Sequence, residues 1–226
     1  MEAAKPVGNT NKSIKDNIFD DLRDNFKKVL NIHLDDRVYN ENKIKTWINN
    51  ILFDTEDYFA KKYPDYDIFL HCFISQNNVY FNVNVRQIFI EGTDGSDWVI
   101  FKNDNMYCIL FFFVYKRYKL DYNLQGIESD ILKKGNELIV KYLEDRKYNP
   151  DKNVDYINHI NIEHIDYILN KKNILRCFAV TIIFKNPIKG KYDFNYLSHG
   201  KDVYKTMFQS YQNESLLCTH DIYFFK

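Results

Sequence analysis

The residues of this chain that could carry out chemistry are six histidines, four cysteines and a serine beside a glycine. A zinc-binding histidine pair on a helix is spaced four residues apart, so that both rings share one face. His159 and His164 are five apart, and neither His71 nor His220 has a partner at ligand spacing. Ser96 lacks the Gly-x-Ser-x-Gly flanks of a nucleophile elbow. We therefore expect no metal, no cofactor and no catalytic residue.

Composition argues against several classes of partner. The 31 Lys and Arg balance the 31 Asp and Glu, whereas phosphate binding needs a clustered excess of positive charge. With only 7 Gly, the chain has no glycine-rich phosphate loop. The longest apolar run, Met106 to Tyr115, is about half of the ~20 residues that a membrane span needs. The first residues also lack the apolar core of a signal peptide. We expect neither a nucleic-acid nor a membrane partner.

The cysteines favour a reducing, cytoplasmic setting. None forms a C-x-x-C pair, and each is embedded in an apolar run, where cysteine usually behaves as a small buried hydrophobe. Cys72 and Cys108 fall on neighbouring predicted strands and are expected to face each other.

The elements that must position these residues follow from periodicity. Apolar residues at helical spacing predict helices over 18–30 and 44–59, and strand patterns follow at 68–76, 79–87, 97–103 and 105–116, with a turn at 91–97. The second half gives helices near 127–145 and 151–171 and strands near 174–185, 191–199, 203–211 and 215–225. Helices followed by runs of strands indicate an α+β fold, with two helices on one face of an antiparallel sheet.

An internal repeat divides the chain. LDDRVYNENK at 34–43 recurs as LEDRKYNPDK at 143–152, and this shift of 109 residues gives 15 identities over 44 positions without a gap. We therefore predict a mobile tail at 1–12, a first domain at 13–116, a connector at 117–125 and a second domain of the same fold at 126–226.

The first domain resembles the Tctex-type dynein light chains. The resemblance is carried by a Lys-x-x-x-Trp helix, a strand with Cys and Gln, an Asp-Gly-Ser turn and a Met-Tyr-Cys strand. These motif positions are Lys43, Trp47, Cys72, Gln76, Asp94, Gly95, Ser96, Met106, Tyr107 and Cys108. The second domain departs from the pattern, because Tyr156 stands in place of Trp47 and Leu-Leu-Cys replaces Met-Tyr-Cys.

The resemblance implies a non-catalytic adaptor. Members of the family form homodimers, exchange the second strand between protomers, and bind an extended segment of dynein intermediate chain or of cargo by strand addition. Here the two domains are expected to pair within one chain as a pseudo-dimer, with the second strands, 79–90 and 191–199, exchanged. The expected peptide-binding edge comprises Val79, Phe81, Val83, Val85, Tyr192, Phe194 and Tyr196.

The expected partners are dynein intermediate chain, cargo segments, or a second copy of the chain through self-association. The resemblance implies a cytoplasmic, cytoskeleton-associated location, and an axonemal motor is equally open. Two alternatives remain: a dynein-independent scaffold of the same fold, and a small α+β enzyme. Core packing explains the alternating pattern at 79–86 as well as a binding edge does, since a half-buried strand alternates in the same way.

Overall fold

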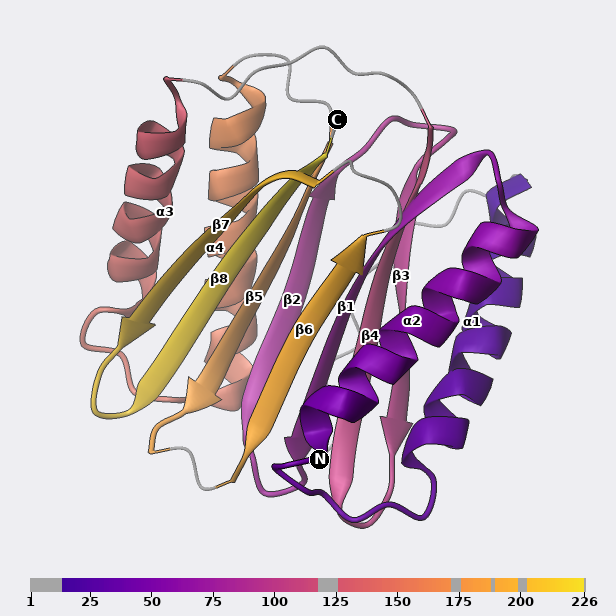
Figure 1. The fold of residues 1–226 in the computed structure, drawn as a ribbon. Coiled ribbons are helices and arrows are strands. Elements are labelled where there is room, and N and C mark those ends of the chain that lie inside the picture. The colour runs from indigo at the N-terminus through magenta and orange to yellow at the C-terminus, as the bar shows by residue number, and fades with distance from the viewer. Residues whose placement is uncertain (1–13, 118–125, 172–175, 188–189, 199–202, 226) are drawn as a thin grey trace.

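The computed structural model describes residues 14–117, 126–171, 176–187, 190–198 and 203–225. The expected tail at 1–12 and nearly all of the expected connector at 117–125 lie outside these ranges. In the first half the elements are α1 (Ile14–Leu34), α2 (Ile44–Lys62), β1 (Tyr66–Gln76), β2 (Phe81–Ile88), β3 (Gly95–Lys102) and β4 (Met106–Lys116). In the second half they are α3 (Glu128–Leu143), α4 (Pro150–Leu169), β5 (Cys177–Lys185), β6 (Tyr192–Ser198), β7 (Val203–Gln212) and β8 (Leu216–Phe225). The predicted α+β class is confirmed (Figure 1).

Local sequence signals explain where the helices begin and end. Asn149 caps α4, because its side-chain oxygen accepts hydrogen bonds from the N–H groups of Asp151 at 3.0 Å and Lys152 at 3.2 Å. Pro150 follows at the first helical position, where its missing N–H is not needed. Asp36 and Asp145 lie just past α1 and α3 with φ of 55° and 57°, the left-handed conformation that often follows a helix.

One asparagine in each half ties the first helix to the last hairpin. Asn103 donates from Nδ2 to the carbonyl oxygens of Leu34 and Arg37, and its Oδ1 accepts from the N–H of Met106 at 2.9 Å. Asn213 makes the corresponding bonds in the second half, to Leu143, Arg146 and Leu216. The same local network therefore occurs in both halves, at positions 109 or 110 residues apart.

The eight strands form two four-stranded antiparallel sheets, and each sheet draws on both halves of the chain. The first has the order β3-β4-β1-β6, and the second has the order β2-β5-β8-β7. β2 pairs with β5 from Phe81 opposite Phe184 to Ile88 opposite Cys177, while β6 pairs with β1. Figure 1 shows β2 lying beside β5 and β6 beside β1 in the middle of the molecule. The second strand of each half thus completes the sheet of the other.

The two sheets pack face to face between two helical layers. α1 and α2 flank the first sheet, and α3 and α4 flank the second, on opposite sides of the molecule (Figure 1). Between the sheets lies a layer of aromatic side chains, in which Phe69 and Phe113 approach Phe178 with ring centroids 5.4 and 5.9 Å apart. Such rings bury large apolar areas and add favourable offset or edge contacts. This shared layer contains 15 of the 38 aromatic residues, so it explains part of the 17% aromatic content.

The expected turn at 91–97 is shorter than predicted, because β3 already begins at Gly95. A Cβ atom at Gly95 would lie 2.9 Å from the Phe19 ring, so glycine allows α1 to approach the start of the strand. Ser96 is therefore part of the sheet, and its hydroxyl donates to the side-chain oxygen of Gln87. Gly95 and Ser96 of the Asp-Gly-Ser motif therefore begin β3, and Asp94 directly precedes the strand.

Candidate functional site

The candidate site is the pair of open strand edges along β2 and β6. Each strand lies at the end of its sheet and has one hydrogen-bonded neighbour. The carbonyl of Tyr80 accepts from the N–H of Lys185 at 2.9 Å, and that of Lys191 accepts from the N–H of Gln76 at 2.9 Å. Because main-chain groups alternate in direction along an antiparallel strand, the next residues present their N–H and C=O groups to the outside. These outward residues are Phe81, Val83, Val85, Tyr192, Phe194 and Tyr196.

The side chains of these six predicted edge residues enter the aromatic layer between the sheets. The Phe81 ring lies 4.9 Å from that of Phe73, and the Tyr192 ring stacks on Phe184 at 4.4 Å. All six remain partly buried. Their side chains therefore belong to the core, while their main-chain groups lie at the sheet edge. Core packing and a binding edge, the two explanations of the alternating pattern, are thus compatible in the same strand. The seventh predicted residue, Val79, precedes β2 and is 6% exposed.

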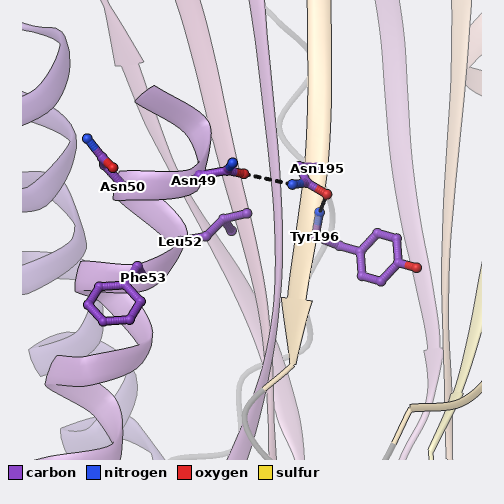
Figure 2. Close-up of a pocket in the computed structure, with 6 residues that line it drawn as sticks. All are labelled: Asn49, Asn50, Leu52, Phe53, Asn195 and Tyr196. Carbon is purple, nitrogen blue, oxygen red and sulfur yellow. Dashed lines mark hydrogen bonds between the residues drawn. The ribbon is translucent and has the colours of Figure 1, made fainter. Parts of the chain in front are cut away.

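Side-chain oxygens occupy the outward donors of β6. The carboxylate of Asp193 accepts from the N–H of Phe194 at 2.9 Å, and the amide oxygen of Asn195 accepts from the N–H of Tyr196 at 2.9 Å. Asn195 is itself held from α2, since it donates to the side-chain oxygen of Asn49 at 2.8 Å. Figure 2 shows this contact, with the Tyr196 ring on the far side of β6. The β6 edge is thus capped by its own side chains.

Two hollows follow the junction between α2 and β6. One, of about 320 Å³, is lined by Asn49, Asn50, Leu52, Phe53, Asn195 and Tyr196 (Figure 2). The other, of about 450 Å³, is lined by Tyr39, Glu41, Ile44, Lys45, Lys191, Tyr192 and Asp193. Burial, with the nearby carboxylates of Asp193 and Glu41, raises the pKa of Tyr39 to about 12, so this phenol is protonated at neutral pH. Phe53 is 61% exposed on α2.

At β2 the corresponding side chains turn toward α4 instead of toward the edge. Asn82 donates to the carbonyl of Pro150 at 3.0 Å and accepts from Asn153 at 3.2 Å. Asn84 accepts from the side chain of Asn161 at 2.8 Å. Amide-to-amide bonds thus attach the outer face of β2 to the helix of the other half, and the two edges differ in what occupies their polar groups.

Most family-motif residues have structural roles. Cys72 and Cys108 face each other as predicted, with their sulfurs 3.8 Å apart. Trp47 and Met106 pack in the first-half core. The side-chain oxygen of Gln76 accepts from the N–H of Lys191 at 2.9 Å, which places this motif residue at the start of the exchanged strand.

Two further motif residues, Lys43 and Tyr107, differ in the contacts that they make. Lys43 precedes α2 at its N-cap position and makes no side-chain capping bond there. Tyr107 lies with its ring 5.7 Å from that of Phe81, so it contacts the exchanged strand β2 from β4. Burial raises the pKa of the Tyr107 phenol.

Asp94 forms a buried ion pair between the two halves. Its carboxylate accepts from Arg176 Nε at 2.7 Å and Nη2 at 3.0 Å, and both side chains are fully buried. The same carboxylate accepts from the N–H groups of Ile90 at 3.0 Å and Lys116 at 3.3 Å. Arg176 also donates to the carbonyl of Lys116 at 2.8 Å and lies over the Tyr115 ring. Bidentate pairing of this kind fixes geometry as well as charge.

A buried polar network in the second half was missed at the sequence level. His164 and His220 lie 2.8 Å apart between ring nitrogens, and His220 also bonds to Thr181 at 2.6 Å. Burial lowers the pKa of His164 to about 4 and lowers that of His220, so both rings are neutral at pH 7. His220 has no partner at metal-ligand spacing in the sequence, and its hydrogen-bonded neighbour His164 lies 56 residues away along the chain. Within the described residues no cluster of three or more His, Cys, Asp or Glu could hold a metal.

A signal for this network existed in the repeat. At the repeat spacing of 109 residues apolar Leu52 corresponds to Asn161, and at the spacing of 110 that follows a one-residue insertion apolar Leu110 corresponds to His220. Polar residues that replace apolar ones at equivalent core positions need partners in the same layer. Comparing the halves position by position would have indicated a second-half cluster.

Comparison with known proteins agrees with this geometry for the first half. Residues 18–115 match the Tctex-1 family, from α1 to β4. The Tctex-1 family consists of non-enzymatic dynein light chains, which are cytoplasmic and associated with the cytoskeleton. No curated protein matches the chain. None of the helices in the described ranges is long and apolar enough to cross a membrane.

Proposed function

We propose that the chain is a dynein light chain-like adaptor built from two tandem Tctex-like domains, 13–116 and 126–226, paired as an intramolecular pseudo-dimer. The observation that carries the proposal is the exchange of β2 and β6, which places both strands at the ends of their sheets, where their outward main-chain groups take no part in sheet pairing. An extended partner segment adds to such an edge through main-chain hydrogen bonds, and flanking side chains supply selectivity. The partner is dynein intermediate chain or a cargo segment, in the cytoplasm or an axoneme.

The proposal is tested by binding to intermediate-chain segments. Purified chain is titrated with overlapping peptides that tile a dynein intermediate chain, and affinity is followed by calorimetry. A segment that binds, and that loses binding when one of its central residues is replaced by proline, supports strand addition. Failure of every segment, while a single-domain light chain binds under the same conditions, contradicts the motor assignment.

A dynein-independent scaffold of the same fold is the second candidate. It is favoured by the family match, which ends at residue 115 and leaves the second half unmatched. The polar network around His164 and His220 shows how far this half has diverged inside. Binding of other extended peptides, but of no intermediate-chain segment, supports this candidate.

The pairing within one chain has its own test. Sedimentation equilibrium gives the mass in solution, and the pseudo-dimer predicts a monomer of 27.3 kDa at every concentration. A mass that doubles at low micromolar concentration shows self-association between chains and contradicts an arrangement in which each chain satisfies its own exchanged strands.

A further inference from the structure

We infer that the two exchanged edges are not equivalent, and that the β2 edge is the one that accepts an extended acidic segment. The inference rests on the proposed strand-addition function and specifies its site and the chemistry of its partner. The comparison uses matched positions, because Phe81 pairs with Phe184 and Tyr192 pairs with Ser75, which is the repeat equivalent of Phe184. Asn82 therefore corresponds to Asp193, and Asn84 to Asn195.

These matched side chains differ in whether they also accept from an outward main-chain N–H group, although Asn84 and Asn195 both bond to a neighbouring helix. Asp193 and Asn195 turn to the edge and occupy the donors of Phe194 and Tyr196. Asn82 and Asn84 turn to α4 and bond with Asn153 and Asn161. An incoming strand needs free donors and acceptors at alternate residues of the edge that it joins. At β6 it must displace two side-chain caps.

The outward main-chain N–H groups of β2 differ from those of β6. In the described part of the chain, no side chain bonds to the N–H groups of Val83 and Val85. The apolar surroundings include Trp98 and Tyr107, which join the same inter-sheet layer, and Ile100 on β3, which is 44% exposed. A segment on this edge can therefore make main-chain bonds and place alternate apolar side chains toward β3.

The charged residues of β2 and β6 indicate which kind of segment each edge would bind. The only charged residue of β2 is Arg86, which is exposed, and the only charged residue of β6 is Asp193. Lys185, opposite Tyr80 at the start of β2, adds a second exposed cation. Neither Arg86 nor Lys185 takes part in the ion pairs of the described residues. Opposite charges on neighbouring strands stabilise the pairing, so the β2 occupant carries acidic residues where it passes Arg86.

The experiment uses a fluorescent peptide of about ten residues that alternates Val with Ser and carries Glu at one end, with a Lys version as the charge control. Anisotropy gives affinity and calorimetry gives stoichiometry. We expect one acidic peptide per chain. The Lys version should bind roughly five-fold more weakly, the change that a cross-strand charge pair supplies.

Two matched proline variants locate the site. Val83→Pro removes an outward donor of β2, and Phe194→Pro removes the corresponding donor of β6. Neither donor serves the pairing within its sheet, and circular dichroism checks that each variant folds. We expect Val83→Pro to weaken binding by about ten-fold or more and Phe194→Pro to leave it unchanged. The reverse pattern overturns the inference while leaving strand addition in place.

Two further variants keep the test decisive if a proline variant does not fold. Arg86→Glu, on an exposed side chain, should reverse the preference between the Glu and Lys peptides. Replacing both Asp193 and Asn195 by Ala removes the caps of β6 and should raise the stoichiometry to two peptides per chain. Two peptides on the unmodified chain, or an unchanged preference in Arg86→Glu, overturns the inference. Absence of acidic-peptide binding overturns it as well, and only a concurrent failure of the intermediate-chain segments contradicts the proposed function.

Discussion

Replacing Asp94 should destabilise both halves of the chain together. The Asp94→Ala substitution removes the carboxylate that accepts from Arg176, Ile90 and Lys116. It removes the carboxylate that pairs with a fully buried guanidinium, that of Arg176. Breaking a buried pair on one side typically costs about 3–5 kcal/mol. For a chain of this size that corresponds to a fall in Tm of roughly 10 °C.

A second ion pair provides the matched control. Asp67 accepts from Arg117 at 2.8 Å, and although Asp67 is buried, the Arg117 side chain is 54% exposed. After Asp67→Ala the guanidinium can turn to water, so the expected loss is only about 1 kcal/mol. The difference between the two variants isolates the effect of leaving a charge buried.

The assay is urea unfolding at pH 7, followed by far-ultraviolet circular dichroism and tryptophan fluorescence. Asp94→Ala, Arg176→Met and the double variant form a cycle. Because the double variant contains no unpaired buried charge, it should be more stable than the sum of the single effects predicts, by at least about 1 kcal/mol. Strict additivity, or an Asp94→Ala loss no larger than that of Asp67→Ala, would refute the reasoning.

Two further predictions concern the second half, and a third concerns the buried cysteines of both halves. Since burial lowers the pKa of His164 to about 4, the unfolded chain binds the extra proton first, and stability falls as pH drops from about 6.5 toward 4, by up to about 3 kcal/mol. Urea unfolding of the unmodified chain and of His164→Gln across this pH range measures the contribution as the difference between their free energies of unfolding. Asp221, whose raised pKa of about 7 acts in the opposite direction, is present in both proteins, so its contribution cancels. Gly135→Ala should lose about 1 kcal/mol or more despite better helix propensity, because its Cβ would lie 2.1 Å from Gln209 Oε1; thermal unfolding tests this. The buried cysteines should react with a thiol reagent only on unfolding, as burial raises the pKa of Cys177 to about 12; fast labelling of native chain contradicts this.

The sequence was sufficient to predict the secondary structure and its order. The predicted helices and strands occur in that order, with bounds that differ by a few residues, because apolar periodicity is strong in a chain with so few Gly and Pro. β4 lies between β3 and β1, a central position that fits a strand whose two faces are both apolar. The facing of Cys72 and Cys108 followed from the same register.

The side-chain contacts that distinguish the two strand edges cannot be predicted from sequence patterns. Asn84 and Asn195 both bond to a neighbouring helix, but the Asn84 oxygen accepts from Asn161, whereas the Asn195 oxygen accepts from the main-chain N–H of Tyr196. The Asp94–Arg176 pair joins residues far apart in the sequence, and no local rule connects them. Such contacts depend on tertiary packing, whereas periodicity reports only which face of an element is buried.

Exchange of strands within one polypeptide also constrains the order of folding. Phe81 in the first half pairs with Phe184 in the second, and Ser75 pairs with Tyr192. Neither sheet can therefore be completed until both halves have left the ribosome. Until then the first half exposes the unpaired edge of β1, a template for wrong pairing with other nascent chains. After synthesis the covalent link between the halves favours correct pairing. Closing a long loop costs little more free energy than closing a short one, and this cost does not depend on protein concentration. A chain of this design can therefore keep its paired sheets at any cellular abundance, and it is exposed to wrong pairing only during synthesis.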